Sequence, residues 1–299
     1  MKIVVTGSLG NISKPLTQAL LAQGHAVTVV SHNPARQQAI AALGAQAAIG
    51  TMEDADFLAT TFTGADAVYC MTSQGGGFSD PNFDMLAYAN KVTNSYKEAI
   101  QRAGVKRVVY LSSVGAHLDK GNGILSFYYY AEKNMNELPA DVAMTFMRPV
   151  AFYYNVLGFI PTIKTQGVIV ANYGGDEPRP WVSPLDIAAA VAEELTSAAT
   201  GRNVRYVASE EISCNAIATI LGTAIGKPDL KWIVIPDEQL LTGMLAAGMN
   251  PQIAAGMVEM YASTRRGELA ADYYRHRPVL GKVKMKEYAQ EFAAIYNRQ

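Results

Sequence analysis

Apolar segments of strand type alternate with helical segments through the first half of the chain. The expected strands cover residues 3–6, 26–31, 46–50, 67–71 and 107–112, and the expected helices cover 14–23, 34–43, 55–62 and 85–103. Strands that alternate with helices pair in parallel through right-handed crossovers, and continuously apolar strands are typical of a sheet covered on both faces. The order therefore predicts an α/β fold built on a doubly wound parallel sheet.

The pattern changes after residue 150. Aromatic and Gly/Pro-rich loops are expected at 152–154 and 172–184, helices dominate the last third, and one strand at 204–208 is expected to return to the sheet. A chain of 299 residues is long enough for a main domain with a smaller partner. We therefore expect a sheet domain over 1–150 and a smaller, mainly helical domain over 151–299 that closes a substrate cleft.

The net charge and the few Cys and His residues argue against several classes of function. The net charge is −1 and the Lys and Arg residues are scattered, so the dense positive surface that binds nucleic acid is not expected. Cys70 and Cys214 lie far apart and the four histidines are dispersed, so the spacing predicts no metal site. The first residues form a strand-like run without signal-peptide features, and no apolar run approaches the roughly 20 residues of a membrane span. We expect a soluble, cytoplasmic protein without a nucleic-acid or membrane partner.

The loop between the first strand and the first helix is the most informative motif. Its spacing is Gly7-x-x-Gly10-x-x-Ser13. Glycine permits a tight turn and close approach of a pyrophosphate, and the helix N-terminus adds unpaired N–H groups and a positive dipole end. Serine is small enough to replace the third glycine of the Rossmann fingerprint. The loop predicts dinucleotide binding through Gly7, Leu9, Gly10, Asn11 and Ile12; the alternative is a turn that only packs the helix.

The end of the second strand distinguishes the two nicotinamide dinucleotides. NAD sites usually carry an Asp or Glu there, which binds the adenosine ribose hydroxyls. Residues 31–36 include no acidic residue, and His32, Asn33 and Arg36 can donate hydrogen bonds to a 2′-phosphate. The segment favours NADP(H), with NAD(H) as the second possibility and a solvated polar loop as the alternative.

Residues 72–77 follow the fourth strand at the carboxyl edge of the sheet, where doubly wound proteins bind ligands. We expect Thr72 and Ser73 to contact the cofactor. The glycines at 75–77 indicate either backbone that passes close to the cofactor or a mobile loop.

Four segments stand out together along the chain. They are Thr6–Gly10, Ala103–Ser113, Thr145–Pro149 with Asn155, and Trp181–Ala188. This set resembles the NmrA-like family of atypical short-chain dehydrogenase/reductase proteins, over nearly the whole chain. The resemblance implies an NADP(H)-binding Rossmann domain, a smaller C-terminal domain and a cleft between them. Some members resemble NADPH-dependent reductases of quinones or triarylmethane dyes, and others resemble redox sensors that bind NADP(H).

A candidate catalytic pair is Tyr129-x-x-x-Lys133, which places a phenol and an ammonium on one face of a helix. An ammonium beside a phenol makes it a better proton donor. Ser113, or its neighbour Ser112, follows the fifth strand and is expected to orient the substrate oxygen. The resemblance implies a Lys-x-x-x-Glu pattern, which Lys133 and Glu137 match, and a contact from Lys133 to the nicotinamide ribose. The alternatives are a packing role for Tyr129 and a solvated lysine.

The aromatic residues 152–155 follow Arg148-Pro149 where the chain leaves the sheet. Phe152 is expected to contact the cofactor, and the cluster is expected either to line the nicotinamide end of a cleft or to be buried at a domain interface. Asp54 and Asp186 are expected to cap helices.

These motifs together favour an NADPH-dependent reductase that transfers hydride to a quinone or another flat, apolar acceptor. We expect it to act as a monomer or homodimer on a small molecule. A non-catalytic NADP(H)-binding sensor that acts through partner binding is the alternative, and an isomerase with tightly held NAD fits less well.

Overall fold

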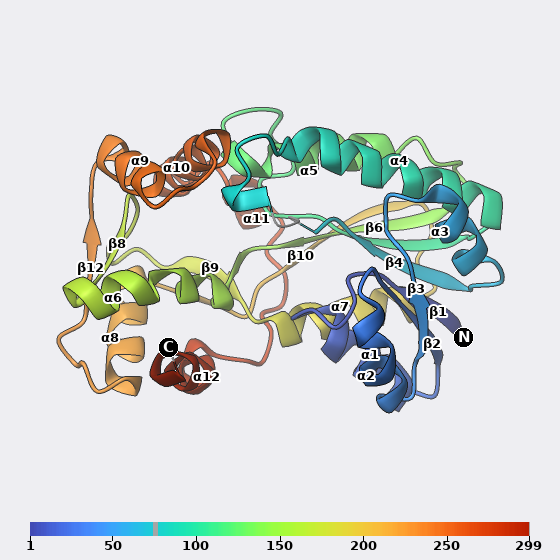
Figure 1. Ribbon diagram of the computed structural model, residues 1–299, viewed down its shortest axis with the longest axis horizontal. Helices are drawn as coiled ribbons and strands as arrows, with labels where there is room; N and C mark the ends of the chain where they lie inside the picture. The colour runs from blue at the N-terminus through green and yellow to red at the C-terminus, as the bar shows by residue number, and fades with distance from the viewer. Residues whose placement is uncertain (74–76, 299) are drawn as a thin grey trace.

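The computed structural model describes residues 1–73 and 77–298, and Figure 1 shows the arrangement of its elements. A seven-stranded sheet with its helices lies at one end of the molecule, and two smaller sheets with the later helices lie at the other. Among the described residues, no helix combines the length and apolar character that a membrane crossing requires.

The large sheet confirms the predicted doubly wound fold. Its order is β10-β6-β5-β4-β1-β2-β3, and its pairings are parallel. The strands are β1 (Lys2–Val5), β2 (Ala26–Ser31), β3 (Gln46–Ile49), β4 (Ala67–Met71), β5 (Arg107–Leu111), β6 (Ala143–Pro149) and β10 (Arg202–Val207). The strand order reverses between β1 and β4, so the crevice that this fold uses for ligands opens at their carboxyl ends.

Helices cover both faces of the sheet, because alternate strand residues enter two separate cores. The face that buries Val5 is covered by α1 (Ser13–Ala22), α2 (Gln37–Ala42) and α7 (Pro184–Thr196). The face that buries Val4 is covered by α3 (Ala55–Phe62), α4 (Met85–Ala103) and α5 (Ser126–Met135).

The later elements form a third core, which includes Tyr153, Trp181 and Phe292. Its strands are β7 (Ala151–Phe152), β8 (Val168–Ala171), β9 (Arg179–Val182), β11 (Glu210–Ile212) and β12 (Lys231–Val234). The helices of this part are α6 (Ile160–Gln166), α8 (Cys214–Ala224), α9 (Asp237–Ala246), α10 (Pro251–Arg266), α11 (Ala271–Arg275) and α12 (Met285–Arg298). Helices dominate this part, as expected.

The proposed division at residue 150 stays a prediction. Elements beyond that residue pack with the large sheet: β10 pairs with β6, and Ile187 of α7 and Tyr273 of α11 lie in the first core. The expectation of an uninterrupted loop over 172–184 is wrong, because β9 lies within it and pairs with β7 and β11.

The two expected helix caps have different outcomes. Asp54 caps α3, since its Oδ1 accepts the N–H of Phe57 at 3.0 Å. The prediction for Asp186 is wrong, because Ser183 caps α7. Asp186 instead lies in the first turn, where it accepts hydrogen bonds from the Ser209 hydroxyl at 2.5 Å and the Val283 N–H at 3.1 Å. It joins α7 to the segment before α12.

Candidate functional site

The loop between β1 and α1 has the tight backbone that a dinucleotide site requires. Gly7 has a φ of +87°, and a Cβ atom there would lie 2.7 Å from Ser13 Oγ. Ser13 donates a 2.8 Å hydrogen bond to the Thr6 carbonyl, so it packs the start of α1 against the end of β1. Ser8 also has a positive φ, of 56°. Serine thus fills the place of the third fingerprint glycine without opening the turn.

The N-terminus of α1 is open to a ligand. Its N-cap residue is the apolar Ile12, and no side chain among the described residues caps the helix, whereas Ser213 caps α8. Lys14 donates its N–H to the Gly10 carbonyl and Pro15 has no N–H, so within the described residues the N–H groups of Ile12 and Ser13 remain without a partner at the positive end of the helix dipole. A phosphate group fits this cradle. Gly10 and Asn11 are exposed, Leu9 is half-buried, and Ile12 is buried and can offer only its backbone.

Polar groups at the end of β2 are tied to this loop. The Ser8 hydroxyl donates to Ser31 Oγ at 2.9 Å, and Ser31 Oγ accepts the Asn33 N–H at 3.2 Å. The Asn33 side chain also caps the short helix η1 (Pro34–Arg36). The three donors predicted here are all exposed beside the loop: His32, Asn33 and Arg36.

The end of β4 forms the other side of the crevice. The hydroxyl of Thr72 lies 2.8 Å from that of Tyr110, and the hydroxyl of Ser73 lies 3.1 Å from that of Tyr88. Both predicted residues therefore already have side-chain partners. Residues 74–76 of the predicted loop lie outside the described residues.

Helix α5 carries the predicted catalytic pair. Lys133 is exposed and, among the residues that the structure describes, forms no ion pair. Glu137 pairs instead with Lys97 of α4 at 2.7 Å. Tyr129 is half-buried, and its ring lies edge-on to Tyr130 at a centroid distance of 5.3 Å. The catalytic roles of Tyr129 and Lys133 stay predictions.

A buried charged network lies beneath α5 and was not predicted from the sequence. Ser112 donates to Glu132 Oε1 at 2.5 Å, and Arg148 binds both oxygens of that carboxylate at 2.9 and 2.6 Å. Arg148 also donates to Asp272 of α11 at 3.3 Å. Burial opposes the positive charge of Arg148, yet its hydrogen bonds with Glu132 hold its pKa above the ordinary value. Ser112 is committed to this network, while the half-buried Ser113 is the serine predicted to face substrate.

The aromatic segment after β6 divides between the two expected locations. Phe152 is half-buried against the first core, and Tyr154 is half-buried with its ring 5.0 Å from that of Phe152. Tyr153 is fully buried in the third core, where its hydroxyl donates to Glu210 at 2.8 Å. Asn155 is exposed. Phe152 and Tyr154 therefore remain candidates to line a cleft, and Tyr153 has a packing role.

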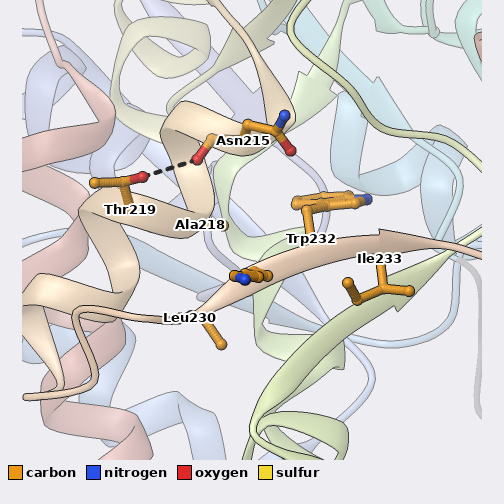
Figure 2. Close-up of a pocket in the computed structure, with 7 residues that line it drawn as sticks. Asn215, Ala218, Thr219, Leu230, Trp232 and Ile233 are labelled. Carbon is orange, nitrogen blue, oxygen red and sulfur yellow. Dashed lines mark hydrogen bonds between the residues drawn. The ribbon is translucent and has the colours of Figure 1, made fainter.

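Two further features limit where metal or ligand chemistry can occur. Over residues 1–73 and 77–298, the His, Cys, Asp and Glu side chains form no group of three that could hold a metal ion. Figure 2 shows a hollow of about 290 Å³ between α8 and β12, beside Thr219 and the indole of Trp232. Its lining comes from residues 215–233, so it is separate from the predicted site.

The NmrA-like family profile matches residues 1–275 of the chain. The chain belongs to the NmrA-like family. This confirms the resemblance found in the four sequence segments, and the match includes the glycine loop, α5 and α7.

Two curated relatives match most of this NmrA-like chain. The NAD(P)H azoreductase of Xenophilus azovorans is 24% identical over 261 residues, which are 87% of this chain and 86% of the relative. The (4-alkanoyl-5-oxo-2,5-dihydrofuran-3-yl)methyl phosphate reductase of Streptomyces griseus subsp. griseus is 25% identical over 270 residues, which are 90% and 89%.

Solved structures share the same fold. The NADPH-dependent quinone oxidoreductase of Escherichia coli has a TM-score of 0.75 at 19% identity, covering 97% of this chain and 98% of that one. The triphenylmethane reductase of Citrobacter sp. has a TM-score of 0.77 at 19% identity, covering 98% and 100%. At these identities the likeness establishes the Rossmann architecture of this NmrA-like protein.

Proposed function

We propose that the protein is an NADPH-dependent oxidoreductase that transfers hydride to a flat, largely apolar acceptor such as a quinone. The observation that carries the proposal is the uncapped N-terminus of α1 above a glycine turn, at the reversal point of a parallel sheet. The curated relatives are named an NAD(P)H azoreductase and a (4-alkanoyl-5-oxo-2,5-dihydrofuran-3-yl)methyl phosphate reductase, and these names support a reductase over an isomerase.

The residues around the crevice fit NADP(H). The backbone N–H groups of Gly7, Leu9, Asn11 and Ile12, which donate to no carbonyl within the described residues, would hold the pyrophosphate, and Thr72 and Ser73 would lie beside it. The exposed side chains of His32, Asn33 and Arg36 would receive the 2′-phosphate, because residues 31–36 place no carboxylate against it. Solved neighbours of this fold include complexes with NADPH and NADP(H). NAD(H) should bind more weakly, since it lacks the phosphate.

In this proposal the catalytic residues act at the nicotinamide end of the cofactor. When bound, NADPH supplies the hydride. Lys133 is exposed and would hold the nicotinamide ribose, Ser113 would orient the acceptor, and Phe152 would stack on the cofactor or acceptor. Tyr129 is the proton donor that the motif spacing predicts.

The test is NADPH oxidation by the purified protein with a panel of quinones, azo dyes, triarylmethane dyes and carbonyl compounds. We expect turnover with at least one aromatic acceptor, with NADPH preferred over NADH. Lys133→Ala should lower kcat/KM at least about tenfold. Lys2→Ala removes an exposed lysine at the amino end of β1, away from the crevice, and should have no effect.

A sensor remains the second candidate, because the crevice is joined to the C-terminal helices. Asn250, the N-cap of α10, donates to the Asp80 carbonyl at 2.6 Å, in the segment that follows β4. Nucleotide binding beside β4 can therefore be transmitted to α10. NADPH binding by calorimetry without oxidation by any acceptor would favour this sensor over the reductase.

A further inference from the structure

The buried carboxylate of Glu132 joins α5 to the ends of two neighbouring strands. Its Oε1 accepts a 2.5 Å hydrogen bond from the Ser112 hydroxyl, directly after β5, and a 2.9 Å hydrogen bond from Arg148 Nε, near the end of β6. Arg148 Nη2 donates to the other carboxylate oxygen at 2.6 Å. The side chains of Glu132 and Arg148 are each only 9% exposed. Directed, buried bonds therefore fix α5 at the carboxyl edge of the sheet, where a doubly wound fold binds its ligand.

The guanidinium of Arg148 is also held from its other side. Its third nitrogen, Nη1, lies 3.2 Å from the Tyr206 hydroxyl of β10 and 3.3 Å from Asp272 Oδ2 of α11. The Tyr206 hydroxyl donates to the same Asp272 oxygen at 2.6 Å. All three guanidinium nitrogens of Arg148 thus have partners, so the group cannot rotate without breaking at least one of these bonds.

The other buried side chains of α5 are largely apolar, and they constrain the orientation of the helix less strictly. Phe127, Ala131 and Met135 are buried in the core on this face of the sheet. Apolar contact is non-directional, whereas a two-bond pair between Arg and a carboxylate fixes both a distance and a plane. A buried ion pair adds little stability over apolar residues of similar size, so its more direct effect is on the geometry of α5.

The residues expected to act on the cofactor follow any movement of Glu132. Lys133 is the next residue of the helix, and Tyr129 lies one turn earlier on the same face as Lys133. The hydrogen-bonded backbone of a helix moves as a unit, so a rotation of α5 about its axis displaces both side chains together. A displacement of about 1 Å at a catalytic group can lower a rate about 100-fold.

We propose that Arg148 is a positioning residue for hydride transfer. Through Glu132 it fixes the rotation of α5 and so holds Lys133 at the nicotinamide ribose, while Arg148 itself touches neither cofactor nor acceptor. The proposal rests on the proposed reductase function, because Lys133 has its role there. Asp272 extends the same positioning to α11, so the C-terminal part of the chain contributes to the placement of α5.

A double-mutant cycle between Glu132→Gln and Lys133→Ala tests the proposal. Circular dichroism first shows that each variant is folded, and kcat/KM is then measured with an acceptor that the wild type reduces. Glu132→Gln should lower kcat/KM about fivefold when Lys133 is present. In the Lys133→Ala background it should lower kcat/KM less than about twofold, because the group that it positions is already absent. Equal losses in the two backgrounds, or no loss in Glu132→Gln, would overturn the proposal.

Two further variants separate positioning from stability. Glu194→Gln is the matched control: the Glu194 side chain is 15% exposed, pairs with Arg205 at 2.9 Å and lies on α7, which covers the opposite face of the sheet from α5. It should lower the free energy of unfolding and leave kcat/KM unchanged. Arg148→Lys keeps the positive charge but cannot reproduce the flat two-bond contact, so it should show the loss in kcat/KM even if Glu132→Gln is too unstable to assay. Full activity in Arg148→Lys, or a loss in Glu194→Gln as large as in Glu132→Gln, would contradict the proposal.

The proposed reductase function fails separately from the positioning role. If the wild type oxidises NADPH with no acceptor, that function fails, and the same cycle is measured as NADPH affinity by calorimetry. Because Lys133 is expected to bind the ribose, Glu132→Gln should weaken NADPH binding about threefold, and only when Lys133 is present. Equal NADPH affinity in Glu132→Gln and the wild type would exclude the positioning role.

Discussion

At the scale of single residues, Gly7 carries the largest conformational demand in the cofactor loop. In Gly7→Ala the new Cβ would lie 2.7 Å from Ser13 Oγ, in a backbone whose φ is +87°. The turn must open, and the N–H groups at the start of α1 then lose their common direction. We expect NADPH affinity to fall at least about tenfold, measured by calorimetry. The positive φ should also cost about 1 kcal/mol of stability.

Gly24→Ala is the matched control for the expected loss of NADPH affinity in Gly7→Ala. Gly24 follows α1 with a φ of +81°, and a Cβ there would meet nothing within 4 Å. Gly24→Ala should lower the free energy of unfolding by a similar amount but leave NADPH affinity unchanged. Equal affinity losses in the two variants would mean that Gly7 matters only through stability.

Loss of the Glu132 carboxylate should lower the free energy of unfolding, because this carboxylate pairs with the buried Arg148 of β6. In Glu132→Gln the buried Arg148 keeps its charge but loses the carboxylate that binds it at 2.6 Å, and it retains Asp272 at 3.3 Å and the Tyr206 hydroxyl at 3.2 Å. Breaking a buried ion pair by removing one partner costs about 3 kcal/mol, which urea unfolding will measure. Glu137→Gln, on the same helix but at the surface, should change the midpoint little. Similar midpoints for the two variants would contradict this account.

The hydrogen-bond and ion-pair partners of the side chains could not be predicted from the sequence. The spacing Lys133-x-x-x-Glu137 is a correct local pattern, but Glu137 bonds to α4, and Glu132 finds its partner 16 residues away on β6. Asp186 has the residue type of a helix cap and lies where one is expected, yet Ser183 takes that role. Such choices depend on which strands become neighbours, and local periodicity contains no information on that.

At the scale of elements, the first half of the chain was predictable in detail, whereas in the second half only the returning strand near 204–208 and the dominance of helices were predictable. The strand at 67–71 and the helices at 55–62 and 85–103 have the bounds expected from the sequence. These elements are long or continuously apolar, and turn residues separate them. In contrast, β9 has four residues and includes Pro180, so its pairing with β7 and β11 is set by the third core instead of by local pattern.

The cofactor loop was predictable for the same reason as the early strands. A glycine turn between a strand and a helix is a local feature, so its position follows directly from spacing. The buried charged network is a different case, because Ser112, Glu132, Arg148 and Asp272 come from the end of β5, from α5, from β6 and from α11. Each of these residues is unremarkable in sequence, and only the folded chain brings them together.

At the scale of the whole molecule, the C-terminal helices meet the sheet domain through two glycines. Gly123 of η3 (Gly123–Leu125) contacts the backbone of Gly256 on α10, and a Cβ on Gly256 would lie 2.6 Å from the Ile124 side chain and 3.0 Å from its backbone nitrogen. Since η3 leads directly into α5, this contact sets how α10 lies beside the helix that carries Tyr129 and Lys133.

Gly256→Ala therefore tests whether this contact holds the two parts together. The added methyl group meets backbone that cannot rotate away, so overpacking should cost about 1–3 kcal/mol in urea unfolding and should speed hydrogen exchange in η3 and the first turn of α5. Gly243→Ala is the matched helical control on α9, where a Cβ meets nothing within 4 Å. It should stabilise the protein by about 0.5–1 kcal/mol, because alanine loses less backbone entropy in a helix. If Gly256→Ala were as stable as Gly243→Ala, α10 would have to move freely relative to η3, and transmission of nucleotide binding from the crevice to α10 would then depend on other contacts, such as that between Asn250 and Asp80.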